Sequence, residues 1–285
     1  MRAIFVGLTT FDIIQYVGEF PGPDAKVEAL GSWMGAGGPA ANAAITFAAL
    51  GGRAQLITAL GRSFAADEAR RDLEALGVHV EDRALEGSCA ISSAVVDRAG
   101  RRTVVSTNAG GFRRLRAGGQ PIGDAEIVLA DGHHAEIALP VLDRAVELRT
   151  AVLLDAGTRR PATDAFLGRS THVIASAAFA AGRPPEIVAR ELLRPQVRLA
   201  AVTAGGRAII AVTHEGIAPA AIAVPAVQAV DTLGAGDVLH GAFAYHLATG
   251  APPLTALRCA AAIASQSCTR RGPRIDRSAA AAQIN

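Results

Sequence analysis

Lysine and cysteine are both scarce in this chain of 285 residues. Lys26 is the only lysine, so arginine supplies nearly all of the positive charge, and this one lysine is a candidate for a specific role. The three cysteines, Cys89, Cys259 and Cys268, are odd in number and form no C-x-x-C pair. This argues against a disulfide framework and against a structural zinc site, and we expect reduced thiols in the core.

Long apolar runs and basic blocks are also missing. No uninterrupted apolar stretch is long enough to cross a membrane, and the first eight residues alternate like a strand, without the apolar region of a signal peptide. We therefore expect a cytoplasmic protein with no membrane contact. The net charge is only +2 and no basic block is interleaved with aromatic residues, so we expect a small substrate and no nucleic acid partner.

Half of the residues are apolar, which is ample for a buried core. Apolar runs typical of strands recur at 3–7, 54–60, 126–130, 151–155, 172–175 and 199–203. Stretches with helical periodicity separate many of them, at 39–50, 66–76, 136–149, 185–193, 236–248 and 254–267. This alternation predicts an α/β fold with a mainly parallel sheet covered by helices on both faces.

Two segments break the alternation. Residues 12–33 and 90–105 are typical of short, partly polar strands with turns at 21–24 and 97–101, and we expect them to lie too far from any helix to join the main sheet by crossovers. We expect them to form a small antiparallel flap contributed from two places in the sequence. Such a flap over a phosphate site would keep water from competing with an acceptor alcohol.

Residues 231–237 read Asp-Thr-Leu-Gly-Ala-Gly-Asp and precede a helical pattern. The first N–H groups of a helix lack internal partners, so Gly234, Ala235 and Gly236 would let backbone donors approach a phosphate closely. Asp237 would then be a general base beside that phosphate. A short Gly-x-Gly-Asp turn with an Asp cap is the simpler interpretation, but the length of the motif favours a kinase.

A second glycine-rich stretch, residues 35–44, also leads into a helix. Gly38 would let the backbone approach a polyhydroxylated ligand, and Asn42 offers a donor and an acceptor there. Asp12 follows the first strand at the edge of the sheet where α/β proteins bind ligands, and a carboxylate there could accept two sugar hydroxyls. A simple helix entry and a solvated loop aspartate are the alternatives for these residues.

These two stretches, DTLGAGD and GGPAANAAITFAALGG, resemble the C-terminal and N-terminal signatures of the ribokinase-like (PfkB) carbohydrate kinases. The resemblance extends over essentially the whole chain and implies a single kinase domain, 1–285. It implies a ribokinase-like, mainly parallel sheet flanked by helices, with a small antiparallel β-lid that often mediates dimerisation. The implied activity is transfer of the γ-phosphoryl group of ATP to a sugar hydroxyl, with Mg2+, in a homodimer assembled through the lid.

Site residues follow from the same resemblance. Asp237 matches the catalytic base, and Gly234, Ala235 and Gly236 match the anion hole. The resemblance also implies sugar contacts at Asp12, Gly38 and Asn42, nucleotide contacts at Thr203 and Gly205, and an adenine pocket near Ala262, Ser265 and the loop 268–274. One departure is the segment 176–179, Ser-Ala-Ala-Phe, which stands where many members carry Asn-x-x-Glu. We therefore expect Mg2+ to be held mainly by ATP and water, and name no metal ligand.

Within the family, GLTTFDIIQYV, GGPAAN, DTLGAGDVLHGAFA and CTRRG are most similar to bacterial sulfofructose kinases and more distantly to ketohexokinase. That likeness would place Lys26 and Asn108 at a substrate sulfonate, where a lysine ammonium suits a tetrahedral anion. His133, however, stands where an arginine would be expected. A sulfosugar, a neutral ketose or aldose, and a nucleoside all remain open as substrates.

Other function classes fit the sequence less well. A dinucleotide-dependent oxidoreductase would share the sheet pattern, but the first strand leads into Gly-Leu-Thr-Thr-Phe-Asp and not into G-x-G-x-x-G. A P-loop kinase would need G-x-x-x-x-G-K-[ST], which is absent. A non-catalytic sugar or nucleotide binder is disfavoured by Asp237, although the missing Asn-x-x-Glu leaves it as an alternative.

Overall fold

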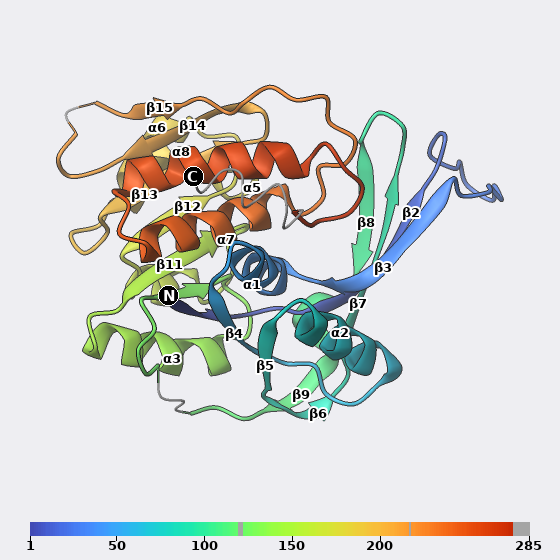
Figure 1. Cartoon of the computed structure of the whole chain (residues 1–285), viewed down its shortest axis with the longest axis horizontal. Helices are drawn as coiled ribbons and strands as arrows, with labels where there is room; N and C mark the ends of the chain where they lie inside the picture. Colours follow the sequence, from blue (N-terminus) through green and yellow to red (C-terminus); the bar gives the residue numbers. More distant parts are fainter. Residues whose placement is uncertain (119–121, 217, 276–285) are drawn as a thin grey trace.

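A nine-stranded sheet forms the centre of the molecule in the computed structural model, which describes residues 1–118, 122–216 and 218–275 (Figure 1). The strand order is β15-β14-β13-β12-β11-β10-β1-β4-β5, and every neighbouring pair from β13 to β5 is parallel. The parallel strands are β1 (Arg2–Val6), β4 (Arg53–Thr58), β5 (Val78–Asp82), β10 (Ile127–Ala130), β11 (Ala151–Ala156), β12 (His172–Ala175) and β13 (Leu199–Ala204).

Helices cover both faces of this sheet, because alternate residues of each strand point to opposite sides. In β1, Ala3 and Phe5 pack against one helical layer, whereas Ile4 and Val6 pack against the other. The first layer contains α1 (Pro39–Ala49), α2 (Phe64–Ala75), α7 (Ala235–Ala248) and α8 (Pro253–Ser267). The second layer contains α3 (Ala135–Glu147), α4 (Thr163–Leu167), α5 (Ala177–Ala180) and α6 (Pro185–Leu192). The strands and helices expected from the sequence alternation are confirmed.

The strand order reverses at β1. The chain proceeds from β1 to β4 and β5 on one side, then returns to place β10 on the other side of β1. In open α/β sheets, ligands bind in the crevice that such a reversal leaves at the carboxyl ends of the strands. The topology therefore directs attention to the residues that follow β1, β10 and β11.

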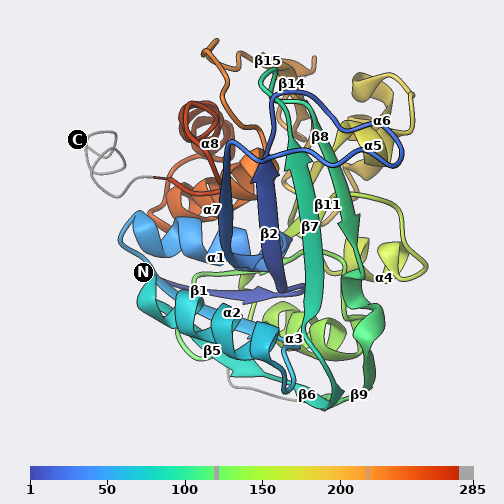
Figure 2. The same cartoon turned by 90° about the vertical axis from the view of Figure 1, so that its right-hand side faces the viewer.

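A separate four-stranded sheet stands beside the central one (Figure 2). We call it the lid sheet, and it contains β2 (Thr10–Tyr16), β3 (Gly31–Gly37), β7 (Ala90–Val96) and β8 (Arg102–Ser106). Its two hairpins are antiparallel, as expected for the segments 12–33 and 90–105, and a parallel pairing of β2 with β7 joins them. The Asp97 carboxylate shapes the β7–β8 turn by accepting the N–H groups of Ala99 and Arg101, each at 2.9 Å.

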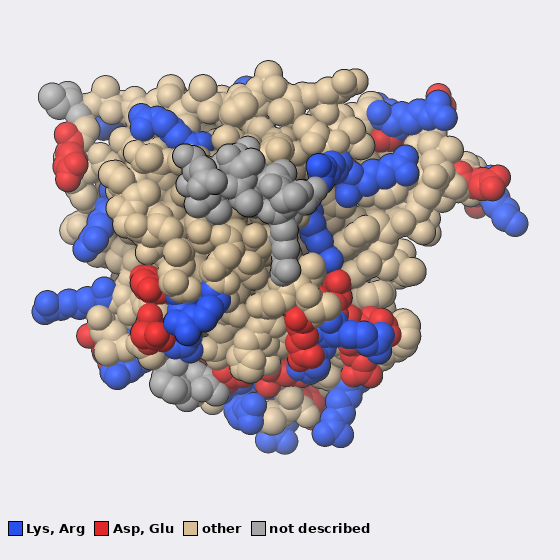
Figure 3. All heavy atoms as spheres, in the orientation of Figure 1, with Lys and Arg blue, Asp and Glu red and all other residues tan. Residues whose placement is uncertain are grey.

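Several short elements were not expected from the sequence. The edge of the central sheet continues as two antiparallel strands, β14 (Arg207–Val212) and β15 (Ala220–Ile222). A separate pair of strands consists of β6 (Ala84–Gly87) and β9 (Phe112–Leu115), and β9 directly follows the 3-10 turn η1 (Asn108–Gly111). Among the described residues, no helix combines the length and the apolarity that a bilayer crossing requires. On the face drawn in Figure 3, basic and acidic side chains are interspersed along the lower edge.

The two helices that follow the glycine-rich motifs, α1 and α7, pack closely at Gly241. A Cβ atom at Gly241 would lie 2.3 Å from the Ala43 carbonyl oxygen and 2.8 Å from the Thr46 Cβ. Glycine is therefore required here by the distance between the two helices. This contact places the first turns of α1 and α7 side by side, which positions the candidate site described below.

We expect Gly241→Ala to lower the free energy of unfolding by about 1 to 3 kcal/mol, because the added methyl group must push α1 and α7 apart. In a domain of this size that corresponds to a fall in Tm of roughly 2 to 10 °C in a thermal melt. Gly22→Ala is the matched control, since nothing lies within 4 Å of a Cβ atom at that position. Equal melting temperatures for Gly241→Ala and Gly22→Ala would contradict this account of the helix contact.

Candidate active site

The loop that precedes α7 is fixed by a left-handed glycine. Gly234 is the N-cap of α7 with φ 73°, and a Cβ atom there would lie 2.4 Å from the Pro273 Cβ. The Asp231 carboxylate supports the same loop by accepting the N–H of Leu233 at 2.9 Å and that of Gly272 at 3.0 Å. The loop is thus held from inside by Asp231 and covered by the segment around Pro273.

The first turn of α7 presents backbone donors without a capping side chain. The N-cap Gly234 makes no side-chain hydrogen bond, and Val238 donates to the Gly234 carbonyl at 2.9 Å. Ala235 and Gly236, which come before Val238, line an open cavity. The Ala235 N–H makes a long contact, 3.4 Å, with the Thr232 carbonyl oxygen. The N–H groups that open a helix have no acceptor within the helix, and beside a cavity they can bind an anion such as a phosphate.

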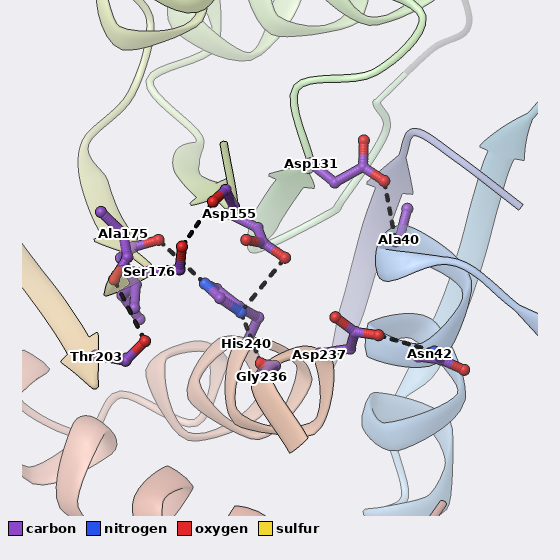
Figure 4. A network of polar contacts seen from close by, with 12 residues as sticks. Ala40, Asn42, Asp131, Asp155, Ala175, Ser176, Thr203, Gly236, Asp237 and His240 are labelled. Carbon is purple, nitrogen blue, oxygen red and sulfur yellow. Dashed lines mark hydrogen bonds and ion pairs between the residues drawn. The ribbon is translucent and has the colours of Figure 1, made fainter. Parts of the chain in front are cut away.

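Asp237 lies one residue further along α7, partly buried, and receives a hydrogen bond from Asn42 Nδ2 at 2.8 Å (Figure 4). Burial, followed by the negative charge of Asp155, raises the pKa of Asp237 to about 7, although Asn42 and His240 act to lower it. Such a carboxylate is ionised above neutral pH and binds a proton more strongly than an ordinary aspartate. This is the property of a general base that works near pH 7.

The cavity next to α7 has a volume of about 550 Å³. It contains three of the four residues that we assigned to the nucleotide, namely Thr203, Gly205 and Ser265. Ala262 is not among its lining residues; α8 turns Ala261, Ala264, Ser265 and Cys268 toward the cavity instead. These positions share one face of a helix, and Ala262 lies off that face. A cavity of this size and mixed lining can hold a nucleotide.

The lid sheet contributes two contacts that sequence analysis missed. Arg102 of β8 lines the cavity and donates to Thr232 Oγ1 at 2.7 Å. Tyr16 of β2 donates its hydroxyl to the Asp231 carboxylate at 2.9 Å. Both contacts join the lid sheet to the loop before α7. In the sequence, the only indication of these contacts was that the predicted lid strands contain polar residues.

A second group of polar residues lies where β1 and β10 end. Gly38 has φ 95° and lies against Leu8 and Thr9, since a Cβ atom at Gly38 would be 2.5 Å from the Leu8 carbonyl oxygen. Asp12 lies in β2 of the lid sheet and accepts a hydrogen bond from Thr10 Oγ1 at 2.5 Å. Burial raises the pKa of Asp12, although Thr10, Arg274 and Ser92 oppose that effect.

Asp131, which sequence analysis did not single out, ties this region together. Its carboxylate accepts the N–H groups of Leu8 at 2.8 Å, Ala40 at 3.1 Å and His133 at 2.9 Å. Burial acts to raise the pKa of Asp131, but His133 and these N–H donors hold it below its usual value. Asp131 directly follows β10, at the edge of the sheet where α/β proteins bind ligands. Asp12 was chosen by the same rule, so Asp131 could have been chosen from the sequence as well.

Several buried polar atoms around Asp131 have no hydrogen-bond partner among the described residues. They are Thr9 Oγ1, Asn42 Oδ1 and the two ring nitrogens of His133, although His133 Nδ1 is 3.1 Å from Asp131 Oδ1. Buried polar groups in proteins are normally satisfied, so orphaned ones next to a candidate base favour a ligand that carries hydroxyl groups. This supports the assignments of Asn42 and His133, which stay predictions.

Asp155 and His240 are two further residues that sequence analysis missed. Asp155 lies in β11, and its Oδ2 is 3.5 Å from His240 Nδ1 on α7 (Figure 4). His240 follows Asp237 by three residues and therefore shares its side of the helix. That spacing was visible in the sequence, whereas the approach of β11 was not.

Lys26 and Asn108 are not brought together within one chain. Lys26 is exposed in the loop between β2 and β3, which projects farthest from the central sheet in Figure 1. Asn108 begins η1, which follows β8 at the opposite end of the lid strands. A seven-residue strand spans roughly 20 Å, so one small ligand would not reach both residues of the same chain.

The segment that departs from Asn-x-x-Glu has a structural role. Ser176 caps α5 by accepting the N–H of Phe179 at 3.1 Å, and its hydroxyl donates to the Gly157 carbonyl at 2.6 Å. Within the described ranges, no group of three or more His, Cys, Asp or Glu side chains is arranged to hold a metal ion.

Comparisons with known proteins give a consistent picture. The chain is 28% identical over 273 residues to the bifunctional protein HldE of a Caulobacter species, and it spans about half the length of that protein, 53%. A candidate ribokinase from Agrobacterium tumefaciens superposes with a TM-score of 0.88 at 27% identity, over 99% of this chain and 97% of that one. Ribokinase of Arabidopsis thaliana, solved with ribose and ATP, superposes with a TM-score of 0.77 at 21% identity, over 99% and 98%.

These structures share the ribokinase-like fold, with a mostly parallel central sheet, flanking helices and a small antiparallel sheet. The family model for pfkB family carbohydrate kinases matches residues 2–280, which is nearly the whole chain. The chain therefore belongs to the pfkB family of carbohydrate kinases.

Proposed function

We propose that this protein transfers the γ-phosphoryl group of ATP to a hydroxyl group of a small neutral sugar, with Asp237 as the general base. The observation that carries the proposal is the position of Asp237. It lies beside Ala235 and Gly236, which line the candidate nucleotide cavity, and it contacts Asn42, whose Oδ1 has no partner among the described residues. The base thus lies between a phosphate site and a hydroxyl site.

The reaction follows from this arrangement. Asp237 takes the proton of the acceptor hydroxyl, whose oxygen forms a bond to the γ-phosphorus while the bond to the bridging oxygen breaks and ADP leaves. The backbone N–H groups at the start of α7 stabilise the negative charge on the transferring group. Mg2+ supplies further charge neutralisation when it is bound. We place it with the ATP phosphates and water, because the described residues form no metal site.

We expect Asp237→Asn to lower kcat by about two to four orders of magnitude while ATP binding stays nearly unchanged, because the amide cannot accept the proton. A coupled assay for ADP and calorimetric titration with ATP would measure the two quantities. Asp67→Asn is a matched control, since Asp67 is an exposed aspartate in the first turn of α2. Full activity of Asp237→Asn would remove Asp237 from the role of base.

Charge favours a neutral acceptor over an anionic one. Three carboxylates lie toward this end of the sheet, those of Asp131, Asp155 and Asp237. The negative charges of Asp131 and Asp155 each act to raise the pKa of Asp237. An anionic sugar would need cations beyond those that already act on these carboxylates, such as Arg274 at Asp12 and Arg160 at Asp155. Lys26, the only lysine, lies far from Asn108 on the lid sheet. A neutral ketose or aldose therefore fits best, with a nucleoside or sulfofructose as alternatives.

We expect Lys26→Ala to leave KM unchanged for a neutral sugar such as fructose, because an exposed lysine without contacts contributes almost nothing. If a sulfosugar is accepted, loss of a desolvated lysine contact would instead raise its KM about tenfold to a hundredfold. Arg98→Ala, in the exposed turn of the neighbouring hairpin, is the control for general charge effects. A panel of neutral sugars, nucleosides and sulfofructose should be assayed with all three proteins. A large KM increase confined to the sulfosugar would overturn the neutral assignment.

The lid sheet has an apolar outer face that fits a second copy of the chain. Across the lid sheet, Met34 pairs with Ile13, Ile13 with Ser93, and Ser93 with Val105. These four side chains therefore lie on the same face of the sheet. Met34 is 61% exposed and Val105 is 71% exposed. The opposite face packs inward through Ile14, Tyr16, Ala94 and Val96. We propose that the protein forms a homodimer through this outer face, because exposed apolar side chains gathered on one sheet face favour association.

We expect Val105→Asp to shift the protein from dimer to monomer in sedimentation velocity, because it places a charge in the proposed interface. Leu148→Asp is the control, since Leu148 is an exposed apolar residue at the end of α3, 43% accessible and outside the lid sheet. A wild-type protein that is monomeric at micromolar concentration, or a Val105→Asp variant that stays dimeric, would contradict the proposal.

A further inference from the structure

Asp155 and His240 form a buried pair that the proposed reaction does not use. Asp155 is 8% exposed and His240 is 5% exposed. Asp155 comes from β11 and His240 from α7, one helical turn after Asp237 (Figure 4). Burying an acid and a base costs free energy unless the two are paired, so the pair calls for an explanation.

The surroundings of the His240 ring determine its protonation. Nδ1 is 2.7 Å from the Gly236 carbonyl oxygen, and Nε2 is 3.2 Å from the Ile174 carbonyl oxygen. A carbonyl oxygen only accepts, and a neutral imidazole has a single N–H group, so a neutral ring would leave one nitrogen lone pair facing an oxygen lone pair. Only the imidazolium donates to both carbonyl groups. The Asp155 carboxylate, 3.5 Å from Nδ1, supplies the opposite charge.

The charged groups near Asp155 come from several elements. His240 lies on α7, Asp131 and His133 follow β10, and Arg160 follows β11. Burial raises the pKa of Asp155, while His240, His133 and Arg160 act to lower it and Asp131 acts to raise it. His240, whose ring has two carbonyl acceptors, is thus the direct partner of Asp155. Without that partner, burial would favour the neutral form of the Asp155 carboxyl group.

We propose that Asp155 is a positioning residue that strengthens the general base, and that a doubly protonated His240 keeps Asp155 ionised near Asp237. The inference rests on the proposed role of Asp237 as the base. Two carboxylates in one buried site disfavour each other's ionisation, so a fixed charge on Asp155 makes Asp237 hold a proton more tightly. His240 both anchors this charge and, through the Gly236 carbonyl, fixes the first turn of α7.

The effect of Asp155 on Asp237 has a definite sign. Asp155 is the largest charge contribution to the raised pKa of Asp237, and the opposing contribution of His240 is smaller. Removing the Asp155 charge therefore lowers the pKa of Asp237 whether His240 stays protonated or becomes neutral in response. A weaker base is ionised at lower pH but takes a proton from an alcohol less readily.

The test is the pH dependence of kcat/KM for Asp155→Asn and the wild type. In the wild type, kcat/KM should fall as pH decreases through about 7, where Asp237 becomes protonated. In Asp155→Asn, this acidic limb should move down by roughly one pH unit, and the plateau should fall several-fold. Titration of ATP itself affects the pH profile of kcat/KM equally in both proteins, so it does not contribute to the difference between them. An unchanged acidic limb in Asp155→Asn, with or without loss of rate, would overturn the proposal.

Two controls separate this inference from the proposed function. Asp164→Asn removes an exposed carboxylate that pairs with Arg194 at 2.7 Å, and its pH profile should match the wild type. Asp237→Asn tests the base itself. Loss of activity in Asp237→Asn together with an unshifted limb in Asp155→Asn would reject only the role of Asp155. An active Asp237→Asn variant would reject both.

A measurement on the wild-type protein does not depend on the folding of any variant. In nitrogen-15 spectra, with His240 assigned through its backbone, both ring nitrogens should show imidazolium shifts at pH 7.5, where a solvated histidine is mostly neutral. His214, which is exposed, serves as the internal reference for the assignment. A neutral tautomer of His240 at pH 7.5 would overturn the assigned charge state and, with it, the proposal.

Discussion

The close packing of α1 against α7 is the contact on which the site depends. Because Gly241 has no side chain, α7 can lie against the Ala43 carbonyl of α1. The same approach brings Asn42 to 2.8 Å from Asp237, although the two residues are 195 positions apart. Helix α1 also carries the Ala40 N–H that binds Asp131. One glycine contact thus fixes the candidate base relative to both the candidate nucleotide cavity and the polar atoms where β1 and β10 end.

The carboxylates at this end of the sheet show how surroundings give one residue type different properties. Asp131 accepts three backbone N–H groups, and its pKa lies below the usual value despite burial. Asp237 has a single amide donor and a neighbouring carboxylate, and its pKa is raised to about 7. Hydrogen bonds therefore favour the ionised form of Asp131, whereas burial and repulsion favour the protonated form of Asp237.

Prediction from the sequence was most accurate where function depends on local chemistry. The run 231–237 does open a helix, and Gly234, which is its N-cap, has a left-handed conformation that glycine adopts readily. Prediction was weakest where a contact joins distant segments. Ala262 was assigned to the cavity, but Ala261 and Ala264 line it, because the rotation of α8 depends on its packing. Asp155 and His240 were missed, since neither the approach of β11 nor that of the Ile174 carbonyl can be deduced from residues near them in sequence.

The sequence by itself determined the alternation of strands and helices, the glycine-rich start of α7, the single lysine and the absence of Asn-x-x-Glu. These features depend on neighbours within a few residues, through periodicity, backbone freedom and capping. Only the tertiary structure decided that β2 and β7 pair in parallel, that Arg102 of the lid sheet contacts Thr232, and that Lys26 and Asn108 lie apart. Such contacts are fixed by how whole elements pack, because many side chains together determine which distant segments meet.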